Sequence, residues 1–356
     1  MKPTKIPPLD QIEVIAPNFK KRYSGVTSTV IRLVPLQAKD IAIVASGPEL
    51  PPEVPNLQPS KLLSLPARGP SGHRVWHARR NVEMMAGVAL KTIARKKLKL
   101  LFTSAAQRKH SKYTRWLIGQ MDALIATSSK SAQYLEHPAT VIHHGVDCEQ
   151  FSPVADRSAL RRDLDLPQDG PLIGCFGRVR PQKGNDLFVQ CMIRAFTAHP
   201  AGCALIMGRA TDEHSDFLDG LKRDVADAGL SERILFRDEV PVEDLARHFQ
   251  ALELYVAPQR WEGFGLTPLE AMSCGAPVVA TRVGAFEDLI IPDTTGYLIN
   301  IEDLDAMTSH VLGLLQDDKK RIKMGTAARA HVVENFSLQK EASSIIAIYR
   351  DLLAAD

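Results

Sequence analysis

The sequence has few cysteines, and none of them occur in pairs. The five are Cys148, Cys175, Cys191, Cys203 and Cys274, an odd number with no Cys-x-x-Cys spacing. Disulfide frameworks and zinc sites both rely on paired cysteines at short spacing. The sequence therefore indicates neither, and we expect the protein to reside in a reducing cytosol.

Long apolar runs are also missing. Residues 1–8 contain no apolar signal core, and no uncharged apolar stretch approaches the roughly 20 residues that a membrane-spanning helix requires. The composition, 45% hydrophobic and 24% charged, is ordinary for a globular protein. Because 356 residues exceed what one hydrophobic core usually spans, we expect two domains.

Two series of short aliphatic runs, each interleaved with helical patterns, indicate two α/β units. The first series predicts strands at residues 12–16, 41–45, 74–77, 99–102, 123–127 and 140–143. The second predicts strands at residues 172–176, 204–207, 234–236, 253–257, 277–280 and 296–299. Strands that alternate with helices are typical of parallel sheets, so both units are predicted to be doubly wound and Rossmann-like.

The most informative motif contains two carboxylates in a predicted strand-to-helix crossing. Glu262 lies in a glycine-rich loop, and Glu270 lies in the first turn of the helix that follows. Loops at the carboxyl ends of parallel strands bind ligands in open α/β sheets. Gly263 and Gly265 would let the backbone approach such a ligand closely. The motif therefore predicts a polar or anionic ligand.

A purely structural explanation exists for Glu270. Thr267 could be the N-cap of the helix and Pro268 its first residue, so that Glu270 completes a capping box without any ligand. Capping explains neither Glu262 nor the two glycines beside it. We therefore favour the ligand-binding interpretation.

A second loop of the same kind carries two basic residues. Arg178 and Lys183 follow the strand predicted at 172–176 and precede a helical pattern at 186–198. Cationic side chains and a helix N-terminus stabilise the charge that develops on a leaving diphosphate without a metal. Taken alone, an exposed Arg and Lys in a solvated loop would be the simpler explanation. Together with the two glutamates, they indicate phosphate binding.

The segment from Glu262 to Glu270, followed by Ala271, Met272 and Pro277, resembles the Glu-x7-Glu signature of retaining glycosyltransferases of family 4. That family has the GT-B fold, in which two Rossmann-like domains face a cleft. The resemblance implies that residues 1–153 bind the acceptor and residues 154–336 bind a nucleotide-sugar. It also implies that residues 337–356 form a helix that crosses back to the first domain.

When the whole chain is considered, the resemblance is to a more specific group of enzymes. Segments 14–20, 24–29, 75–81 and 102–108 resemble bacterial lipopolysaccharide core mannosyltransferases, which transfer mannose from GDP-mannose to the Kdo of the inner core. This implies an enzyme at the inner face of the cytoplasmic membrane, with a nucleotide-sugar co-substrate and neither a metal nor another cofactor. The residues themselves indicate only a nucleotide-diphosphate-sugar site.

The family motifs assign roles to matching positions. Glu270 would bind ribose hydroxyls, Glu262 would bind the sugar or phosphate, and Arg178 with Lys183 would stabilise the departing diphosphate. Glu262 could also be a nucleophile, although front-side attack is favoured here. The predicted donor site is completed by Gly25, Gly208, Arg209, Val240, Gly263, Phe264, Gly265, Leu266 and Thr267.

The chain departs from the wider family at two places. Ser24 stands where many relatives have the first of two adjacent glycines before Gly25. Many members have a histidine at the end of the strand predicted here at 99–102, whereas this chain has Thr103 and no histidine directly after it. His77 and His110 are the nearest histidines, and for both a structural or surface role is favoured over catalysis.

Charge is divided unevenly along the sequence. Residues 1–150 hold 22 Lys and Arg against 10 Asp and Glu, a balance of +12, whereas residues 151–356 hold 22 against 31, a balance of −9. Such a basic region attracts an anionic membrane or an acidic lipid-linked acceptor, although a merely solvated surface is equally open. No nucleic-acid motif is present. The candidate contacts are His77, Arg79, Arg80, Arg95, Lys96, Lys97, Lys99 and His110.

Other functions stay open at this point. A family 4 transferase with another nucleotide-sugar and another anionic acceptor would have the same motifs, as would an epimerase or phosphorylase on this fold. A non-catalytic membrane-surface protein would retain the basic region and lose the glutamates. A nicotinamide dehydrogenase is disfavoured, because Gly263 and Gly265 do not begin a Gly-x-Gly-x-x-Gly motif.

Overall fold

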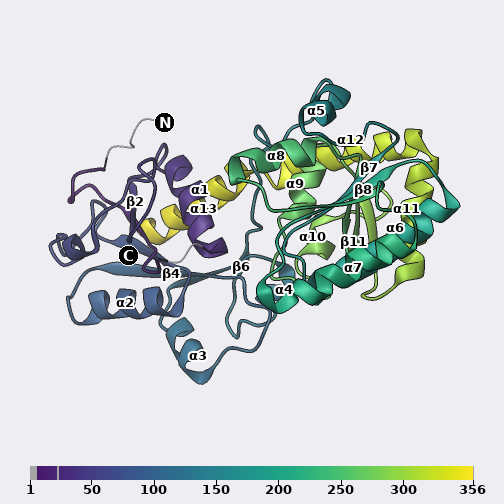
Figure 1. Cartoon of the computed structure of the whole chain (residues 1–356). Helices are drawn as coiled ribbons and strands as arrows, with labels where there is room; N and C mark the ends of the chain where they lie inside the picture. Colours follow the sequence, from purple (N-terminus) through teal and green to yellow (C-terminus); the bar gives the residue numbers. More distant parts are fainter. Residues whose placement is uncertain (1–5, 22–23, 356) are drawn as a thin grey trace. The chain divides into compact units, whose positions relative to one another are not determined.

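The computed structural model describes residues 6–21 and 24–355, which form two units, each with a six-stranded parallel sheet (Figure 1). Unit 1 comprises Met1–His143 and Leu338–Asp356, and unit 2 comprises His144–Ser337. All strand pairs in both sheets are parallel. The predicted fold class, two Rossmann-like α/β units, is confirmed.

The strands lie where the aliphatic runs predict them, and no strand end differs by more than two residues. Unit 1 contains β1 (Val14–Pro17), β2 (Ile43–Ser46), β3 (Arg74–Ala78), β4 (Leu98–Ser104), β5 (Ala123–Ala126) and β6 (Thr140–Val141). Unit 2 contains β7 (Leu172–Phe176), β8 (Cys203–Met207), β9 (Ile234–Arg237), β10 (Leu254–Ala257), β11 (Val278–Thr281) and β12 (Gly296–Ile299).

Helices cover both faces of each sheet. Those of unit 1 are α1 (Gly25–Gln37), η1 (Pro59–Leu62), α2 (Asn81–Thr92), α3 (Lys112–Ile118), α4 (Ser129–Ala132) and α13 (Leu338–Ala354). Those of unit 2 are α5 (Arg157–Asp163), η2 (Pro181–Lys183), α6 (Asn185–Ala198), η3 (Asp212–His214), α7 (Ser215–Asp227), α8 (Val242–Gln250), α9 (Thr267–Ser273), α10 (Phe286–Leu289), α11 (Leu304–Gln316) and α12 (Asp318–Asn335).

Alternation within the strands separates the two cores of unit 1. Val14 packs in one apolar cluster with Leu33 of α1 and Ile345 of α13. Its neighbour Ile15 points to the other face, where it joins the cluster that includes Met84 of α2. Successive side chains of a strand point to opposite faces, so a run that is apolar at every position is buried on both.

Strand order places a switch point in each sheet. The order is β2-β1-β3-β4-β5-β6 in unit 1 and β12-β11-β10-β7-β8-β9 in unit 2. The chain therefore moves outward in opposite directions from β1 and β3, and from β7 and β10. Ligands of open α/β sheets bind at the carboxyl ends of the strands at such a point.

The boundary between the two units falls earlier in the chain than the resemblance implies. Unit 2 already begins at His144, whereas the predicted boundary falls at 153/154. Phe151 is buried against Phe249 with ring centroids 5.8 Å apart, and Arg329 of α12 donates 2.8 Å hydrogen bonds to the carbonyls of Cys148 and Phe151. The segment before α5 belongs to the core of unit 2 because its apolar side chains and its carbonyl groups both find partners there.

The C-terminal helix α13 belongs to unit 1 and packs beside α1. Its Tyr349 is fully buried, and the hydroxyl group lies 2.6 Å from Nδ1 of His77 in β3. Among the described residues, no helix combines the length and the apolar character needed to cross a bilayer.

Arg329 provides a test of the boundary. We expect Arg329→Met to lower the free energy of unfolding by about 2 kcal/mol, because it removes the donor to the buried carbonyl of Cys148 and leaves the carbonyl of Phe151 with the hydroxyl group of Ser273 alone. Urea denaturation measures the change. Lys323→Met, at an exposed position of the same helix, is the matched control and should change the free energy by less than about 0.5 kcal/mol. Equal effects of the two variants would contradict the assignment.

Candidate active site

The loops after β7 and β10 meet through an ion pair between two predicted site residues. Glu262 lies in the loop between β10 and α9, and its Oε2 accepts a hydrogen bond from Nζ of Lys183 at 2.5 Å. Its Oε1 accepts one from the backbone N–H of Gly263 at 2.9 Å. The Glu262 and Lys183 side chains are 18% and 21% exposed, so both remain accessible to a ligand.

Arg260 fixes these two loops to each other. Its guanidinium forms a bidentate ion pair with Asp186 of α6 at 2.7 and 2.8 Å and a second ion pair with Glu302, while its backbone N–H donates to the carbonyl of Gln182 at 3.0 Å. The hydrogen bond to Asp186, and after it the one to Glu302, contribute most to raising the pKa of Arg260 above its ordinary value. The sequence analysis did not identify this residue.

Two glycines are required by the geometry of these loops. Gly184 has φ of +69°, and a Cβ atom there would lie 2.0 Å from the carbonyl oxygen of Pro258. Gly265 has φ of +88°, and its Cβ would lie 2.3 Å from the ring of Phe286. Only glycine combines this backbone conformation with such a close approach. Around Gly263 the space is open, since a Cβ there would meet a single atom at 4.0 Å.

The start of α9 contains no capping box. Leu266 occupies the N-cap position, and its apolar side chain makes no capping hydrogen bond. The backbone N–H of Glu270 donates to the carbonyl of Leu266 at 3.0 Å, as an ordinary helical bond. The structural explanation that the sequence allowed for Glu270 is therefore wrong.

Tyr255 of β10 connects the start of α9 with the neighbouring strand. Its hydroxyl group donates to the carbonyl of Phe176 at 3.2 Å and interacts with Thr267. Burial raises the pKa of this hydroxyl well above its ordinary value, so it stays protonated and can donate. Sequence reasoning missed Tyr255; the available signal was one polar group within an otherwise aliphatic buried strand.

The other predicted donor-site residues of unit 2 lie at the same edge of the sheet. Gly177 has φ of +126°, and a Cβ there would meet no atom within 4 Å, so the backbone beside exposed Arg178 is open. Gly208, after β8, lies very close to Gly177. A Cβ atom at Gly208 would lie 2.0 Å from the carbonyl oxygen of Gly177. Exposed Arg209 follows at once and accepts a 3.1 Å hydrogen bond at its carbonyl from the N–H of Val179.

Val240 lies at this same edge of unit 2, after β9, whereas Gly25 lies in unit 1. Val240 follows the edge strand β9 and packs half-buried against the core of unit 2. Gly25 is the first residue of α1 in unit 1, where a Cβ would meet nothing within 4 Å. Ser24 is the N-cap of that helix and accepts from the N–H of Thr27 at 3.4 Å.

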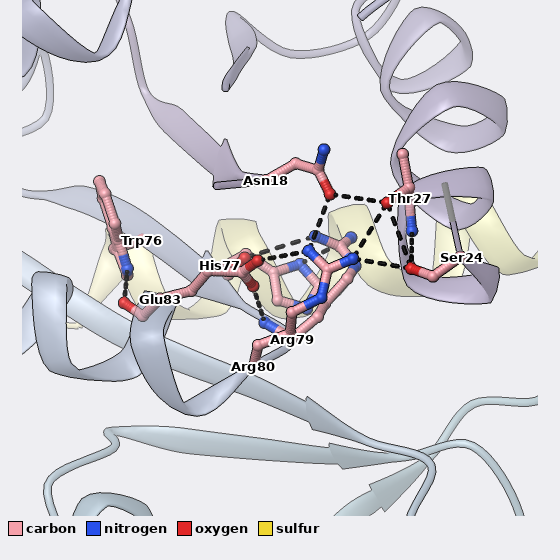
Figure 2. Close-up of polar contacts among 8 residues, drawn as sticks. All are labelled: Asn18, Ser24, Thr27, Trp76, His77, Arg79, Arg80 and Glu83. Atoms are coloured by element: carbon pink, nitrogen blue, oxygen red, sulfur yellow. Dashed lines mark hydrogen bonds and ion pairs between the residues drawn. The ribbon is translucent and has the colours of Figure 1, made fainter. Parts of the chain in front are cut away.

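A polar cluster lies at the switch point of unit 1, where β1 and β3 end (Figure 2). The guanidinium of Arg80 donates to Oδ1 of Asn18 at 2.8 Å, to Ser24 at 2.9 Å and to Thr27 at 3.0 Å, and it forms an ion pair with Glu83 at 2.8 Å. Arg80 therefore connects Asn18, the residue after β1, with the start of α1.

His77 and Arg79 do not lie on the surface that the sequence analysis expected. His77 is fully buried between the hydroxyl groups of Tyr349 and Thr103, at 2.6 and 2.7 Å. Burial, followed by the charge of Arg79, lowers the pKa of His77 well below its ordinary value, so the ring is neutral. Arg79 is 8% exposed. Both predicted acceptor contacts are corrected to internal residues.

The remaining predicted acceptor contacts differ in exposure. Arg95 and Lys97 are exposed, whereas Lys96 is half-buried and its ammonium group donates to the carbonyls of Leu63 and Leu65. Lys99, on β4, and His110, in the loop before α3, are also half-buried. Burial and then Arg108 lower the pKa of His110, so its ring is neutral at pH 7.

The sequence of the chain is similar to characterised glycosyltransferases. Residues 156–331 match the family model of glycosyl transferases group 1. The chain is 49% identical over 352 residues to the lipopolysaccharide core biosynthesis mannosyltransferase LpcC of Rhizobium leguminosarum, covering 98% of this chain and 99% of the relative. It is 47% identical over 348 residues to LpsB of Rhizobium meliloti, covering 96% and 98%.

Solved structures show the same architecture. The structure of Anabaena HepE in complex with UDP superposes with a TM-score of 0.81 over 96% of this chain and 100% of that one, at 18% identity. Such a low identity establishes the fold alone. The Glu-x7-Glu segment, the parallel order of both sheets and the near full-length similarity together show that the chain is a glycosyltransferase of group 1 with the GT-B fold, in the family that includes LpcC and LpsB.

Proposed function

We propose that the protein is a retaining mannosyltransferase that transfers mannose from GDP-mannose to the Kdo-containing inner core of lipopolysaccharide. The observation that carries the proposal is the pairing of Glu262 with Lys183 at the switch point of unit 2, in a chain similar from end to end to two lipopolysaccharide core mannosyltransferases. Donor and acceptor identity rest on that similarity.

The donor roles follow from charge and hydrogen-bonding capacity. Glu270 accepts from the ribose hydroxyl groups, and Glu262 with the N–H groups of residues 264–267 binds the sugar or a phosphate. Arg178 and Lys183 stabilise the leaving diphosphate. Lys183 already contacts Glu262, so its ammonium group can bridge that carboxylate and a phosphate oxygen, as a three-donor group permits.

The reaction proceeds by front-side attack. An acceptor hydroxyl oxygen forms a bond to the anomeric carbon on the face from which the phosphate oxygen departs, and the bond between that carbon and the phosphate oxygen breaks. The leaving phosphate oxygen takes the acceptor proton. Because both oxygens of Glu262 already accept hydrogen bonds, from Lys183 and Gly263, this carboxylate is better suited to holding the donor than to nucleophilic attack.

Unit 1 supplies the acceptor side of the reaction. The polar cluster around Arg80 lies at the carboxyl ends of β1 and β3, where a parallel sheet binds its ligands. The balance of +12 in residues 1–150 favours an anionic, lipid-linked acceptor and a peripheral location at the inner face of the cytoplasmic membrane. No metal or other cofactor is required by this scheme, since Arg178 and Lys183 provide the positive charge.

A melting screen tests the donor. GDP and GDP-mannose should raise the melting temperature of the protein more than the matching UDP and ADP compounds, because selective binding to the folded state stabilises it by mass action. A larger shift with a UDP- or ADP-sugar would overturn the GDP assignment.

Glu270→Gln tests the ribose contact. Transfer should fall at least about tenfold, since a charged acceptor is replaced by a neutral one, while the free energy of unfolding changes by less than about 1 kcal/mol. Initial rates and urea denaturation measure both. Glu232→Gln, an exposed carboxylate elsewhere in unit 2, is the control and should leave the rate unchanged. A folded Glu270→Gln variant with wild-type donor affinity and turnover would exclude the role.

Arg178→Ala and Lys183→Ala test the stabilisation of the leaving group. Each should reduce kcat about a hundredfold or more, because both cations act on charge that develops in the transition state. Lys222→Ala removes an exposed cation from α7 and serves as the control. Wild-type activity should survive a chelator. Full activity of both variants, or chelator-sensitive wild-type activity, would contradict this division of roles.

A further inference from the structure

Helix α3 in unit 1 exposes two stacked aromatic side chains. Tyr113 and Trp116 are 49% and 50% exposed, and their ring centroids lie 6.4 Å apart with an interplanar angle of 21°. The neighbouring face of the same helix is buried through Thr114, Leu117 and Ile118. The helix is therefore already anchored in the core, and the aromatic pair is not needed for its packing.

Basic residues surround the aromatic pair. Residues 105–121 contain four basic residues and no acidic one. All four are exposed, and Arg115 forms a 2.9 Å ion pair with Glu136. Aromatic rings with a polar tip and basic side chains are the residue types that favour the boundary between lipid and water. The four are Arg108, Lys109, Lys112 and Arg115.

The place of α3 in the sheet connects this surface with the acceptor side. The helix follows the carboxyl end of β4, on the same edge of the sheet as the cluster around Arg80. Asn81, the residue after Arg80, donates from Nδ2 to Oγ1 of Thr114 in α3 at 2.8 Å. A bilayer that binds α3 therefore lies at the edge where unit 1 can hold a lipid-linked saccharide.

A second basic segment lies at the opposite edge of the sheet. Arg95 and Lys97 are exposed between α2 and the amino end of β4, beside Ile93, which is 82% exposed. This segment has no aromatic side chain, and Lys96 is engaged by the carbonyls of Leu63 and Leu65. This segment carries similar charge at the amino edge of the sheet, away from the acceptor side. Variants of Arg95 and Lys97 can therefore serve as controls for variants of α3.

We propose that α3 is the surface with which the enzyme docks on an anionic lipid bilayer, with Tyr113 and Trp116 inserted at the lipid–water boundary and Arg108, Lys109 and Lys112 over the anionic headgroups. The proposal deepens the proposed transfer to a lipid-linked acceptor, since it rests on that acceptor lying in a membrane. Apolar burial and charge attraction act together in this kind of binding.

Co-sedimentation of the full chain with vesicles tests the surface. The vesicles contain phosphatidylcholine with phosphatidylglycerol, at low and at physiological salt. Tyr113→Ser/Trp116→Ser should weaken binding about tenfold or more, and Lys109→Gln/Lys112→Gln should weaken it severalfold at low salt. Arg95→Gln/Lys97→Gln removes the same charge and should weaken it less than twofold. Greater loss in this last variant, or no binding of the wild type at low salt, would overturn the proposal.

Fluorescence reports insertion directly. The three tryptophans are Trp76, which is fully buried, Trp116, and Trp261 in unit 2. In a Trp261→Phe background, lipids brominated on the acyl chain should quench the emission on vesicle binding. Adding Trp116→Phe should abolish that quenching, because only buried Trp76 remains. Quenching that persists, or that never occurs, would exclude insertion of Trp116.

Two acceptors separate this proposal from the proposed function. The aromatic variant should transfer to a water-soluble, delipidated acceptor at the wild-type rate and lose activity on acceptor embedded in vesicles. An equal loss on both acceptors would overturn the docking role. Wild-type protein that binds vesicles through α3 but transfers no mannose to either acceptor would refute the proposed function and leave the docking surface intact. Melting temperatures identify any variant that fails to fold.

Discussion

The neighbouring position of β7 and β10 is the constraint on which the candidate active site depends. It brings together Lys183 and Glu262, which are 79 positions apart in the sequence, and Arg260 reinforces the contact through Asp186. Partly exposed ion pairs contribute little to stability, so their importance lies in geometry. They hold opposite charges at the edge of the sheet in positions where a diphosphate and sugar hydroxyl groups can replace or join the internal partners.

Local geometry outweighs net charge in unit 2. Residues 144–337 hold 20 Lys and Arg against 30 Asp and Glu, a balance of −10, which by itself would repel a nucleotide-sugar. Arg178 and Arg209 are nevertheless exposed in adjacent loops at the carboxyl edge, with Lys183 close by. At physiological ionic strength, salt screens the electrostatic interaction of surface charges beyond about 8 Å. The nearest cations therefore decide whether an anion binds.

The strands and the motif loops could be predicted because both are local patterns. Buried parallel strands are continuous aliphatic runs, and the segment from Glu262 to Glu270 carries its own glycines and helix start. The contacts of Arg260 and Tyr255 could not be predicted, since their partners in α6 and β7 are brought near by strand order. The burial of His77 depends on Tyr349, which is 272 positions away in the sequence, and no spacing near His77 indicates it.

The basic stretch from Arg74 to Arg115 shows why a charge count gives an incomplete functional prediction. Arg74 is buried with its guanidinium donating to the carbonyls of Leu9, Ile12 and Pro66, and burial lowers its pKa, so this cation holds the chain before β1 in place.

The rest of that stretch is divided by strand direction. Residues 95–97, directly before β4, lie at the amino edge of the sheet, and residues 105–115, after β4, lie at the carboxyl edge, as do Arg79 and Arg80 after β3. In the sequence these two groups are separated only by the seven residues of β4. In unit 1 they lie at opposite ends of a strand, and only the second adjoins the edge at which parallel sheets bind ligands. The direction of one strand therefore determines which basic residues can act together with a bound acceptor.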